Sequence, residues 1–544
     1  MILILKIIAI LHFRVDSDET QHAHVVWALT NGQLPYRDFF DNHMPLFQMA
    51  CAPLLSLLGE HGFVIIELRF AMLAPFFVCL WCVFRLAEKL FPAGMAPWAS
   101  LGAAAFPQFF YTSTEFRPDD LWAALWLTAL VVALCGSFTF KRAFLFGIIL
   151  GSAFGVSLKT VLLTASIGIS VAIALGLQIG LGRKQTSWKS IPLYLLLIGG
   201  GAIIVPGCIV FYFASKGSLW IMYYCVIQHN IFPGLRTWQR FKYDQWIFPI
   251  SAPFLIGLGI LSYRQARDPR IGIRRAIVVL TPCIYVILLF SYWREITRED
   301  NLPYVPLLPL AAIPLFILLR RCFKGAPLEK LFFPVCLPVI CAIEILCVWR
   351  MTPLRTNRVQ GTTIGIRDVL LLSQPGDAVM DAKGDSVFRP RPIYWVYEPL
   401  TKARIRKGVI DDHLAASMIR TRTRLCYFSG DRWEPASAAF IGANYVHFDK
   451  DSFDLAVAGK ELGSSSNDGT FSFDVIIPAR YAIVSETGVT DGILDGKPYS
   501  TPVELDGGHH WFRRKSGGGW AAIFLADALA HGFHPLFDPS PRIP

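Results

Sequence analysis

An acidic cluster, Asp16-Ser17-Asp18-Glu19, follows directly on the first apolar segment of the chain. Carboxylates at a membrane face cost free energy unless they are solvated, paired or used, so this placement favours chemistry at a bilayer surface. A carboxylate near a low-dielectric boundary can have the raised basicity that a general base needs. We therefore predict that Asp18 accepts a proton from an attacking hydroxyl, with Asp16 and Glu19 as further catalytic candidates.

The same residues could instead have a structural role. Apolar residues recur at helical spacing directly after the cluster, which predicts an amphipathic helix. Asp16, Ser17 or Asp18 could merely cap that helix, because short polar side chains satisfy the free amide donors of a helix N-terminus.

Metal binding is a further alternative for this stretch, because several possible ligands lie close together in the sequence: Asp16, Asp18, Glu19, His22, His24 and His43. Their spacing matches no defined zinc site. The Asp16-Ser17-Asp18 triplet also resembles the Asp-x-Asp motif of nucleotide-sugar transferases, but no Rossmann-type domain accompanies it. We therefore predict neither a metal nor a cofactor.

A second polar motif, Glu115-Phe116-Arg117-Pro118-Asp119-Asp120, lies between two apolar segments. Arg117 could pair with a phosphate or a carboxylate, and Asp119 could hold a sugar hydroxyl or the acceptor. The motif could equally be an ordinary helix start, with Pro118 in the first turn and the acids favouring the helix dipole.

Isolated cations in apolar surroundings supply the other candidates. Lys159 interrupts a long and nearly uncharged stretch, where a lysine usually has a partner or snorkels to the interface. The loop 223–246 interleaves cations with aromatic rings, which suits a lipid-linked phosphate as well as ordinary phospholipids. The predicted substrate-binding residues are Arg117, Asp119, Lys159, His43, Arg236, Arg240 and Lys242.

The composition points to a membrane protein. The chain has 544 residues, of which 54% are hydrophobic and only 17% are charged, and its mean hydropathy is +0.46. A soluble domain averages about 25% charged residues. The net charge of +11 could suggest nucleic acid as a partner, but the basic residues are scattered through short loops, as the positive-inside rule predicts. We predict no nucleic-acid partner.

Apolar segments suited to membrane spans recur through the first 350 residues, at about 1–13, 62–84, 95–112, 120–137, 143–158, 160–181, 190–214, 246–263, 276–292, 303–319 and 330–349. A span needs roughly 20 residues, so the first segment is short. The pattern predicts an α-helical polytopic membrane protein with about eleven spans. The pair at 143–181 shares Lys159 at its junction and could instead form one kinked or re-entrant unit.

Every alternate loop is basic and nearly free of acids, which indicates the cytoplasmic side. We therefore predict a multi-pass protein of a bacterial plasma membrane, with its N-terminus in the cytoplasm and the region after residue 350 outside. Two spans or none within 143–181 preserve this orientation, whereas a single span inverts everything downstream.

The composition changes abruptly after Arg350, where short apolar runs begin to alternate with turn signals. A helix, a turn and a buried strand are predicted over 364–382, and the pattern becomes mostly β after about 450. The predicted domains are a transmembrane catalytic domain over 1–350, a soluble extracytoplasmic α/β domain over 351–450, and a β-rich, sandwich-like region over 451–544.

The first 350 residues resemble a known enzyme class. The Asp18-Glu19 pair after the first apolar segment, the loop from Asn31 to Leu46 (Asn-Gly-Gln-Leu-Pro-Tyr-Arg-Asp-Phe-Phe-Asp-Asn-His-Met-Pro-Leu) and the Arg117-Pro118-Asp119 element look like those of polyprenyl-phosphate-dependent GT-C glycosyltransferases. The most similar group comprises the protein mannosyltransferases and aminoarabinose transferases. The resemblance implies a GT-C-like fold, chemistry without a metal, and contact between Lys159 and the phosphate of the donor.

These observations predict an inverting glycosyltransferase that moves a sugar from a polyprenyl-phosphate donor to a lipid, glycan or protein acceptor, with membrane lipids as further partners. Its acceptor group would be a hydroxyl or a phosphate on the outer face of the membrane. A transporter or flippase of lipid-linked saccharides is the alternative, but we find neither inverted repeats nor broken helices. A membrane-tethered binding protein would leave the many apolar segments unexplained.

Overall fold

The computed structural model describes residues 1–180, 190–231, 244–293, 296–325, 328–354, 356–428, 432–448, 455–463, 469–486, 488–515 and 519–536. The chain divides into two compact units. Unit 1 comprises residues 1–13, 42–50 and 66–357, and unit 2 comprises residues 14–41, 51–65 and 358–544. Short stretches from the N-terminal part of the sequence therefore belong to the same unit as the C-terminal region.

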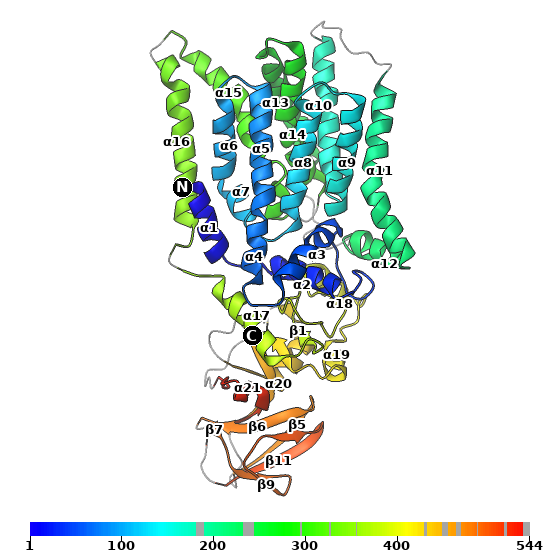
Figure 1. Cartoon of the computed structure of the whole chain (residues 1–544), viewed down its shortest axis with the longest axis vertical. Helices are drawn as coiled ribbons and strands as arrows, with labels where there is room; N and C mark the ends of the chain where they lie inside the picture. Colours follow the sequence, from blue (N-terminus) through cyan, green and yellow to red (C-terminus); the bar gives the residue numbers. More distant parts are fainter. Residues whose placement is uncertain are drawn as a thin grey trace. The chain divides into compact units, whose positions relative to one another are not determined.

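Helices make up most of the described residues up to Met351 (Figure 1). They are α1 (Ile2–His12), α2 (Ser17–Thr30), α3 (Leu46–Leu58), α4 (Val64–Ala71), α5 (Leu73–Leu90), α6 (Met95–Ala105), α7 (Pro107–Thr112), α8 (Pro118–Leu134), α9 (Phe140–Val156), α10 (Thr160–Gly180), α11 (Ile191–Ser215), α12 (Leu219–Tyr223), α13 (Asp244–Arg264), α14 (Pro269–Tyr292), α15 (Leu308–Cys322) and α16 (Leu328–Met351). A π-helical turn covers Tyr224–Gln228, and two short 3₁₀ helices cover Arg298–Asn301 and Val305–Leu307.

Each apolar segment predicted from the sequence is helical. Among the described residues, six helices are long and apolar enough to cross a membrane: Val64–Leu90, Thr160–Gly180, Ile191–Ser215, Pro269–Tyr292, Arg298–Cys322 and Glu329–Met351. The class of multi-pass helical membrane protein is thereby confirmed, whereas the count of about eleven spans is not.

Two predicted segments are each interrupted in the structure. The segment 62–84 contains α4 and most of α5, which are separated at Met72. The segment 95–112 is two helices, α6 and α7, because Pro107 lacks the amide hydrogen that would continue α6. The separate segments predicted at 143–158 and 160–181 are two helices, α9 and α10, with a break at Ser157–Lys159. The pair is therefore not one continuous helix, and whether it forms two spans or one kinked or re-entrant unit stays a prediction.

Glycines allow α9 and α11 of unit 1 to pack at close range. A Cβ atom on Gly147 or Gly151 would collide with backbone atoms of α11, and one on Gly201 would collide with backbone atoms of α9. Small residues spaced four apart commonly mediate such contacts between helices in membranes, where lipid tails compete with larger apolar side chains. This small-residue pattern is a sequence signal for the α9–α11 pair that our sequence analysis missed.

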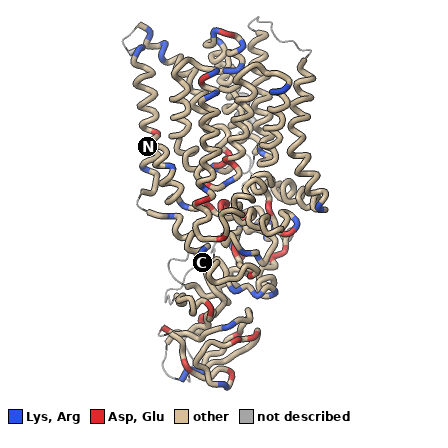
Figure 2. The backbone as a smooth tube through the Cα atoms, viewed as in Figure 1, with Lys and Arg blue, Asp and Glu red and all other residues tan. Residues whose placement is uncertain are grey.

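Charged residues are sparse along the long helices of unit 1 (Figure 2). Lys and Arg gather at the upper end of the bundle in this view, where α13 is followed by α14 and α15 is followed by α16. Arg267 lies in the connection between α13 and α14, Arg270 lies in the first turn of α14, and Arg321 lies in the last turn of α15. Basic loops thus share one end of the helix bundle.

Unit 2 combines short helices with two β-sheets. Its further helices are α17 (Gln360–Leu372), α18 (Pro399–Arg406), α19 (Leu414–Arg420), α20 (Pro435–Asn444) and α21 (Ala526–Ala530). Its strands are β1 (Val379–Met380), β2 (Leu425–Tyr427), β3 (Tyr445–His447), β4 (Leu455–Gly463), β5 (Thr470–Val475), β6 (Ala479–Ser485), β7 (Gly488–Val489), β8 (Gly492–Leu494), β9 (Lys497–Tyr499), β10 (Val503–Leu505), β11 (Gly508–Arg514) and β12 (Ala521–Leu525).

The larger sheet has the strand order β1-β2-β4-β12-β6-β10, with β3 also paired to β4 and β7 to β6. Strands β1 and β2 are parallel, with Val379 opposite Leu425, and the other pairs in this sheet are antiparallel. The smaller sheet has the antiparallel order β5-β11-β8-β9. Because β4 pairs with both β2 and β12, the larger sheet continues across the domain limit predicted at residue 450.

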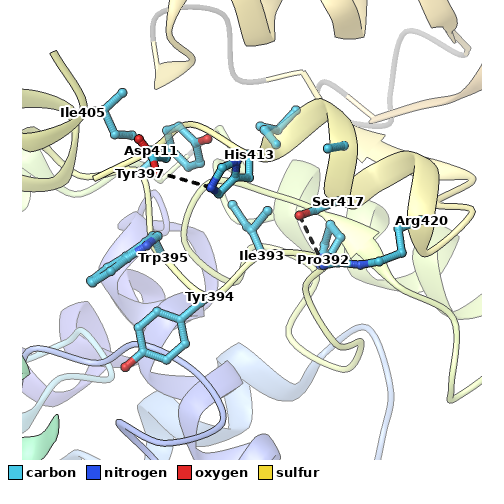
Figure 3. A pocket seen from close by; sticks show the side chains of 12 residues that line it. Pro392, Ile393, Tyr394, Trp395, Tyr397, Ile405, Asp411, His413, Ser417 and Arg420 are labelled. Carbon is cyan, nitrogen blue, oxygen red and sulfur yellow. Dashed lines mark hydrogen bonds and ion pairs between the residues drawn. The ribbon is translucent and has the colours of Figure 1, made fainter. Parts of the chain in front are cut away.

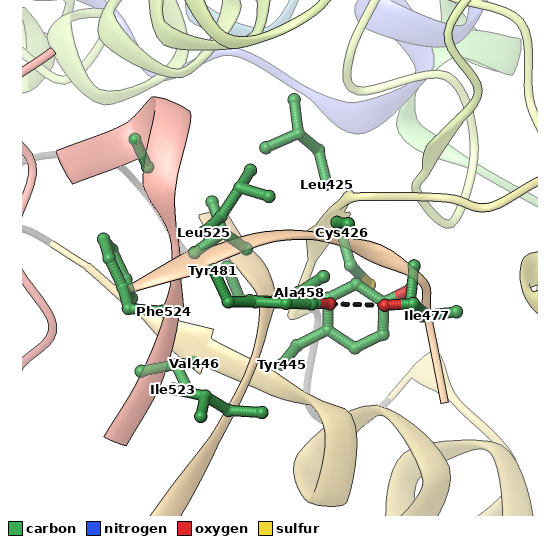
Figure 4. Close-up of a cluster of buried hydrophobic side chains, with 14 of the residues drawn as sticks. Leu425, Cys426, Tyr445, Val446, Ala458, Ile477, Tyr481, Ile523, Phe524 and Leu525 are labelled. Carbon is green, nitrogen blue, oxygen red and sulfur yellow. Dashed lines mark hydrogen bonds between the residues drawn. The ribbon is translucent and has the colours of Figure 1, made fainter. Parts of the chain in front are cut away.

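One apolar core joins these elements (Figure 4). Strand β12 and the first half of β4 (455–459) are continuous apolar or small-residue runs that are buried throughout, as in strands buried on both faces. Tyr481 is buried, and its hydroxyl donates to the carbonyl oxygen of Ile477 at 2.6 Å. A turn at Asp495-Gly496 joins β8 to β9, and both residues have positive φ. A C-terminal region rich in β-structure is therefore confirmed.

Candidate functional site

The predicted base, Asp18, is paired with a lysine of the C-terminal region within unit 2. It lies in the first turn of α2, and its Oδ1 accepts a hydrogen bond from Nζ of Lys383. The two side chains are 23% and 15% exposed. Burial alone would lower the pKa of Lys383, but the carboxylates of Asp18 and Glu398 outweigh it and raise that pKa. Asp18 therefore faces a stable ammonium group.

Asp16 and Glu19 form the N-terminal cap of α2. The Asp16 side chain accepts from the backbone amide of Asp18 at 3.1 Å, and Glu19 Oε1 accepts from the backbone amide of Asp16 at 2.9 Å. This reciprocal capping box satisfies amide donors that would otherwise lack partners. The capping role considered for the cluster thus falls to Asp16 and Glu19, while Asp18 projects from the helix start toward Lys383.

Lys383 belongs to a tightly organised loop, residues 381–391, at the carboxyl end of the parallel strand β1. Asp381 is its centre, because this buried carboxylate accepts from the backbone amides of Gly384 and Ser386 at 2.6 and 2.9 Å. The guanidinium of Arg391 lies 3.0 Å from the same carboxylate. These contacts fix the backbone from which Lys383 projects.

Helix α2 packs directly against this 381–391 loop. Thr20 Oγ1 donates to Oδ1 of Asp385 at 3.1 Å, and His24 Nδ1 lies 2.9 Å from the carbonyl oxygen of Val387. Gly384 has a φ of +113°, and a Cβ atom on it would lie 2.7 Å from Cβ of His24. Only glycine suits this position, because the backbone is left-handed and the helix leaves no room.

Backbone strain occurs on both sides of this contact. Val387 has a φ of +56° and Tyr36 a φ of +69°, although neither is glycine. Such conformations cost about 1–3 kcal/mol each and persist where the surroundings over-determine them, often near functional sites. The outlier at Val387 directs its carbonyl oxygen to His24. The strain at Val387 is therefore part of the contact between the Lys383 loop and helix α2.

Acidification is expected to destabilise the chain through His24. Burial lowers the pKa of His24 below its ordinary value of 6.5, and this outweighs the nearby Asp381 carboxylate and the bond to Val387. Because the pKa is depressed in the folded state, the contribution of His24 to stability is fully present above about pH 6.5 and is lost as the pH falls through the folded-state pKa. Thermal unfolding of the full chain between about pH 7.5 and about pH 5 measures the effect.

In the same experiment, His24→Gln should flatten this part of the pH dependence, since glutamine does not titrate. His531→Gln is the matched control, because His531 is an exposed histidine of the same unit. An unchanged pH dependence in His24→Gln would contradict the assignment.

In unit 1, Arg117 lies in a buried network of carboxylates. Its guanidinium is 3.5 Å from Asp119, 3.7 Å from Glu299 and 4.0 Å from Glu115. Arg298 reaches Glu115 at 2.5 Å. The structure therefore brings the predicted residues Arg117 and Asp119 together, and it supplies two acids and a cation, Glu299, Glu115 and Arg298, that were not among the predicted residues.

Lys159 also has an acidic partner. Its Nζ donates to Oδ1 of Asp300, which is fully buried, and lies 5.8 Å from the centre of the Trp293 ring. Asp300 follows Glu299, so Lys159 and Arg117 contact neighbouring carboxylates. Within this network the carboxylates of Glu115, Asp119, Glu299 and Asp300 face the cations of Arg117, Lys159 and Arg298. A phosphate bound here would compete with carboxylates for every cation.

A buried lysine in α1 was missed by the sequence analysis. Lys6 Nζ donates to the carbonyl oxygen of Phe110 at 2.6 Å and to Ser113 Oγ at 2.8 Å, and it lies 4.5 Å from the centre of the Phe76 ring. A lone lysine within an apolar segment is the sequence signal that could have identified it. The comparable signal for Lys383 is the run Asp381-Ala-Lys-Gly-Asp385 after a predicted buried strand, since loops at the carboxyl ends of parallel strands commonly bind ligands.

The remaining candidates are less informative. His43 is half-buried in unit 1, ahead of α3. Arg236, Arg240 and Lys242 lie outside the described residues. Among the residues that the structure describes, no group of three or more His, Cys, Asp or Glu side chains is arranged to hold a metal ion.

Each unit therefore presents a distinct chemical arrangement. Unit 2 holds a carboxylate, Asp18, that can accept a proton once its ammonium partner shifts or is compensated. Unit 1 holds cations that can bind an anion if their ion pairs with the neighbouring carboxylates break. Both arrangements are anchored in helix starts, at α2 and α8, where the first-turn amides favour negative charge.

Comparison with known proteins identifies the fold. No protein-family model and no curated protein sequence matches this chain. The crystal structure of ArnT from Cupriavidus metallidurans in the apo state is 13% identical, covers 84% of this chain and 96% of its own, and has a TM-score of 0.56. The structure of the same protein bound to undecaprenyl phosphate has the same identity and coverage and a TM-score of 0.54.

A second similar structure is that of the archaeal oligosaccharyltransferase AglB from Archaeoglobus fulgidus, in complex with an inhibitory peptide and a dolichol-phosphate. It is 10% identical, the match covers 93% of this chain and 73% of the AglB chain, and the TM-score is 0.43. That score is too low to support a conclusion. The likeness to ArnT extends through nearly the whole ArnT chain, and at 84% of this chain it is longer than the helical part up to Met351. This chain therefore has the GT-C fold of the ArnT structures, which confirms, at the level of the fold, the resemblance drawn from its sequence.

Proposed function

We propose that this protein is an inverting glycosyltransferase that moves a sugar from a polyprenyl-phosphate donor to an acceptor hydroxyl or phosphate. The observation that carries the proposal is the shared fold with ArnT, one structure of which is bound to undecaprenyl phosphate. The paired Asp18 carboxylate and the buried cations of unit 1 add the residue types that such a reaction requires.

In the proposed reaction, an oxygen of the acceptor attacks the anomeric carbon of the sugar as the bond from that carbon to the phosphate oxygen breaks. The Asp18 carboxylate takes the proton of the attacking hydroxyl. The departing lipid phosphate carries the negative charge, and cations such as Arg117 and Lys159 stabilise it. Because the nucleophile enters opposite the leaving group in one displacement, the configuration at the anomeric carbon inverts.

The proposed setting is the outer face of a bacterial plasma membrane. Basic loops share one end of the helix bundle, and the positive-inside rule assigns that end to the cytoplasm. The N-terminus is then cytoplasmic, with about eleven spans and an extracytoplasmic C-terminal region. Acceptors there include lipids, glycans and proteins. His43, Arg236, Arg240 and Lys242 are proposed to contact the donor or the surrounding lipid.

Transfer of a radiolabelled sugar tests this function. Membranes that contain the chain, and matched membranes without it, are incubated with polyprenyl-phosphate donors carrying different labelled sugars. We expect one donor to lose its label to a new product and to release the free polyprenyl phosphate. Recovery of an intact lipid-linked saccharide on the opposite leaflet, with no bond cleaved, would instead identify the transporter or flippase alternative.

A further inference from the structure

Unit 2 contains a pocket that the proposed chemistry does not use. The cavity has a volume of about 400 Å³, within the ~300–1,000 Å³ typical of small-molecule sites. It lies between the segment Pro392–Tyr397 and helix α19 (Figure 3). We call it the aromatic pocket, after Tyr394, Trp395 and Tyr397 in its lining.

The aromatic side of the pocket is rigidly supported. The rings of Tyr394 and Trp395 lie 4.9 Å apart at 90°, and Phe40 packs against Trp395 at 5.1 Å. The hydroxyl of Tyr394 donates to the carbonyl oxygen of Tyr36. The aromatic loop around residues 34–41 therefore packs behind Tyr394 and Trp395 and supports this side of the pocket. The rings of Tyr394 and Trp395 remain partly exposed, so a ligand can contact them.

Beside apolar residues such as Ile405 and Leu414, the lining contains two pairs of polar groups. Nε2 of His413 lies 3.6 Å from Asp411, and the Arg420 guanidinium lies 3.4 Å from Ser417 Oγ (Figure 3). The carboxylate of Asp411 and the guanidinium of Arg420 carry opposite charges. The lining therefore offers both donors and acceptors of hydrogen bonds.

Asp412 holds the polar side of the pocket in place through its hydrogen bonds. Asp412 accepts hydrogen bonds from the hydroxyls of Tyr397 and Ser437 at 2.5 and 2.6 Å, and its Oδ1 lies 3.3 Å from the backbone nitrogen of Leu414. These bonds join the aromatic segment, α19 and α20. The two sides of the pocket are thus held at a defined separation before any ligand binds.

We propose that the aromatic pocket binds a neutral saccharide, as part of the glycan of an acceptor. A pyranose ring has an apolar face of C–H groups, which suits the electron-rich face of an aromatic ring such as Trp395. Its hydroxyls both donate and accept hydrogen bonds, which matches the paired acid, imidazole, hydroxyl and guanidinium groups opposite. The assignment to an acceptor rests on the proposed glycosyl transfer, whereas saccharide binding itself does not.

Other ligand classes fit the lining less well. A phosphate group would meet the Asp411 carboxylate together with Arg420 and gain no net attraction. A lipid tail would cover the polar groups of the lining, which would then lose their hydrogen bonds to water. A neutral ligand with one apolar face and many hydroxyls can pack that face on the aromatic rings and form hydrogen bonds with the polar groups.

The pocket is linked to the loop of Lys383 through a short stretch of chain. The backbone amide of Tyr397 donates to the carbonyl oxygen of Ala382 at 2.8 Å, and Arg391 donates to the same oxygen at 3.1 Å. The segment that forms the aromatic wall is therefore hydrogen-bonded to the residue beside Lys383, the partner of Asp18. A saccharide held in the pocket would belong to the same rigid part of unit 2 as the proposed base.

Saturation-transfer difference NMR tests the proposal on the full-length chain in detergent, with the neutral disaccharides maltose, lactose, chitobiose and mannobiose as probes. We expect at least one of them to bind, and Trp395→Ala to weaken that binding about ten-fold through loss of ring stacking. Trp395→Phe should retain most of the affinity. Trp511→Ala is the matched control, because Trp511 is an exposed tryptophan of β11 outside the pocket, and it should change nothing.

The proposal is overturned if no disaccharide binds, if Trp395→Ala and Trp511→Ala bind alike, or if inorganic phosphate displaces the bound sugar. In the transfer assay, Trp395→Ala should raise the KM for a glycan acceptor and leave the KM for the donor unchanged. Saccharide binding without any transfer by the natural chain would refute the proposed function but not the pocket.

Discussion

Turnover by Asp18→Asn is expected to fall by about 10²–10⁴-fold, the usual contribution of a general base. Asparagine preserves the size of the side chain and can still accept the hydrogen bond of Lys383, but it lacks the basic oxygen. The capping box of α2 is built by Asp16 and Glu19, so the helix start should survive the change. Sugar transfer from the labelled donor measures turnover, and donor binding measured separately should stay normal.

The neighbouring carboxylates and Lys383 provide the controls. Asp16→Asn should be mildest, because asparagine caps helices about as well as aspartate. Glu19→Gln should be damaging but less so than Asp18→Asn. Lys383→Met removes the partner of Asp18 and leaves the base in place. If Lys383→Met and Asp18→Asn reduce turnover equally, Asp18 is the structural half of an ion pair and its assignment as the base is wrong.

Lys159→Met is expected to destabilise the chain by about 3–5 kcal/mol, because it leaves the buried carboxylate of Asp300 without its cation. Replacing both partners, as Lys159→Met with Asp300→Asn, should restore most of the loss, since no uncompensated charge is then left inside. The free energy of unfolding in detergent measures both effects. Lys216→Met, which removes an exposed lysine of the same unit, should leave stability unchanged.

The double variant also separates the two roles of Lys159. If the ammonium stabilises the donor phosphate, kcat/KM for the donor should be about ten- to a hundred-fold lower in the folded double variant. This is the effect of losing one charge-assisted hydrogen bond. Normal donor kinetics in a stable double variant would restrict Lys159 to a structural pair with Asp300.

Much of the architecture followed from local sequence patterns. Apolar stretches between 62 and 349 form helices because, in lipid, only a helix satisfies its own backbone within one segment. The buried strand at Val379–Met380 and the β-structure after about residue 450 were recognisable from short apolar runs between turn signals. The Asp495-Gly496 turn was recognisable because both residues tolerate a positive φ. Arg117 and Asp119, two residues apart at a helix start, meet for the same local reason.

The long-range partners depended on the tertiary structure alone. Asp18 and Lys383 are 365 positions apart, and Lys159 and Asp300 are 141 apart, so no periodicity or spacing relates them. Whether an ionisable group serves as a base, a cap or half of an ion pair depends on such neighbours, because short-range charge and hydrogen bonding set its role. The aromatic pocket likewise exists only because folding places the 34–41 loop behind Tyr394 and α19 across from Trp395. The sequence alone therefore determined the class of protein and most of its elements, while the pairing of its functional groups required the fold.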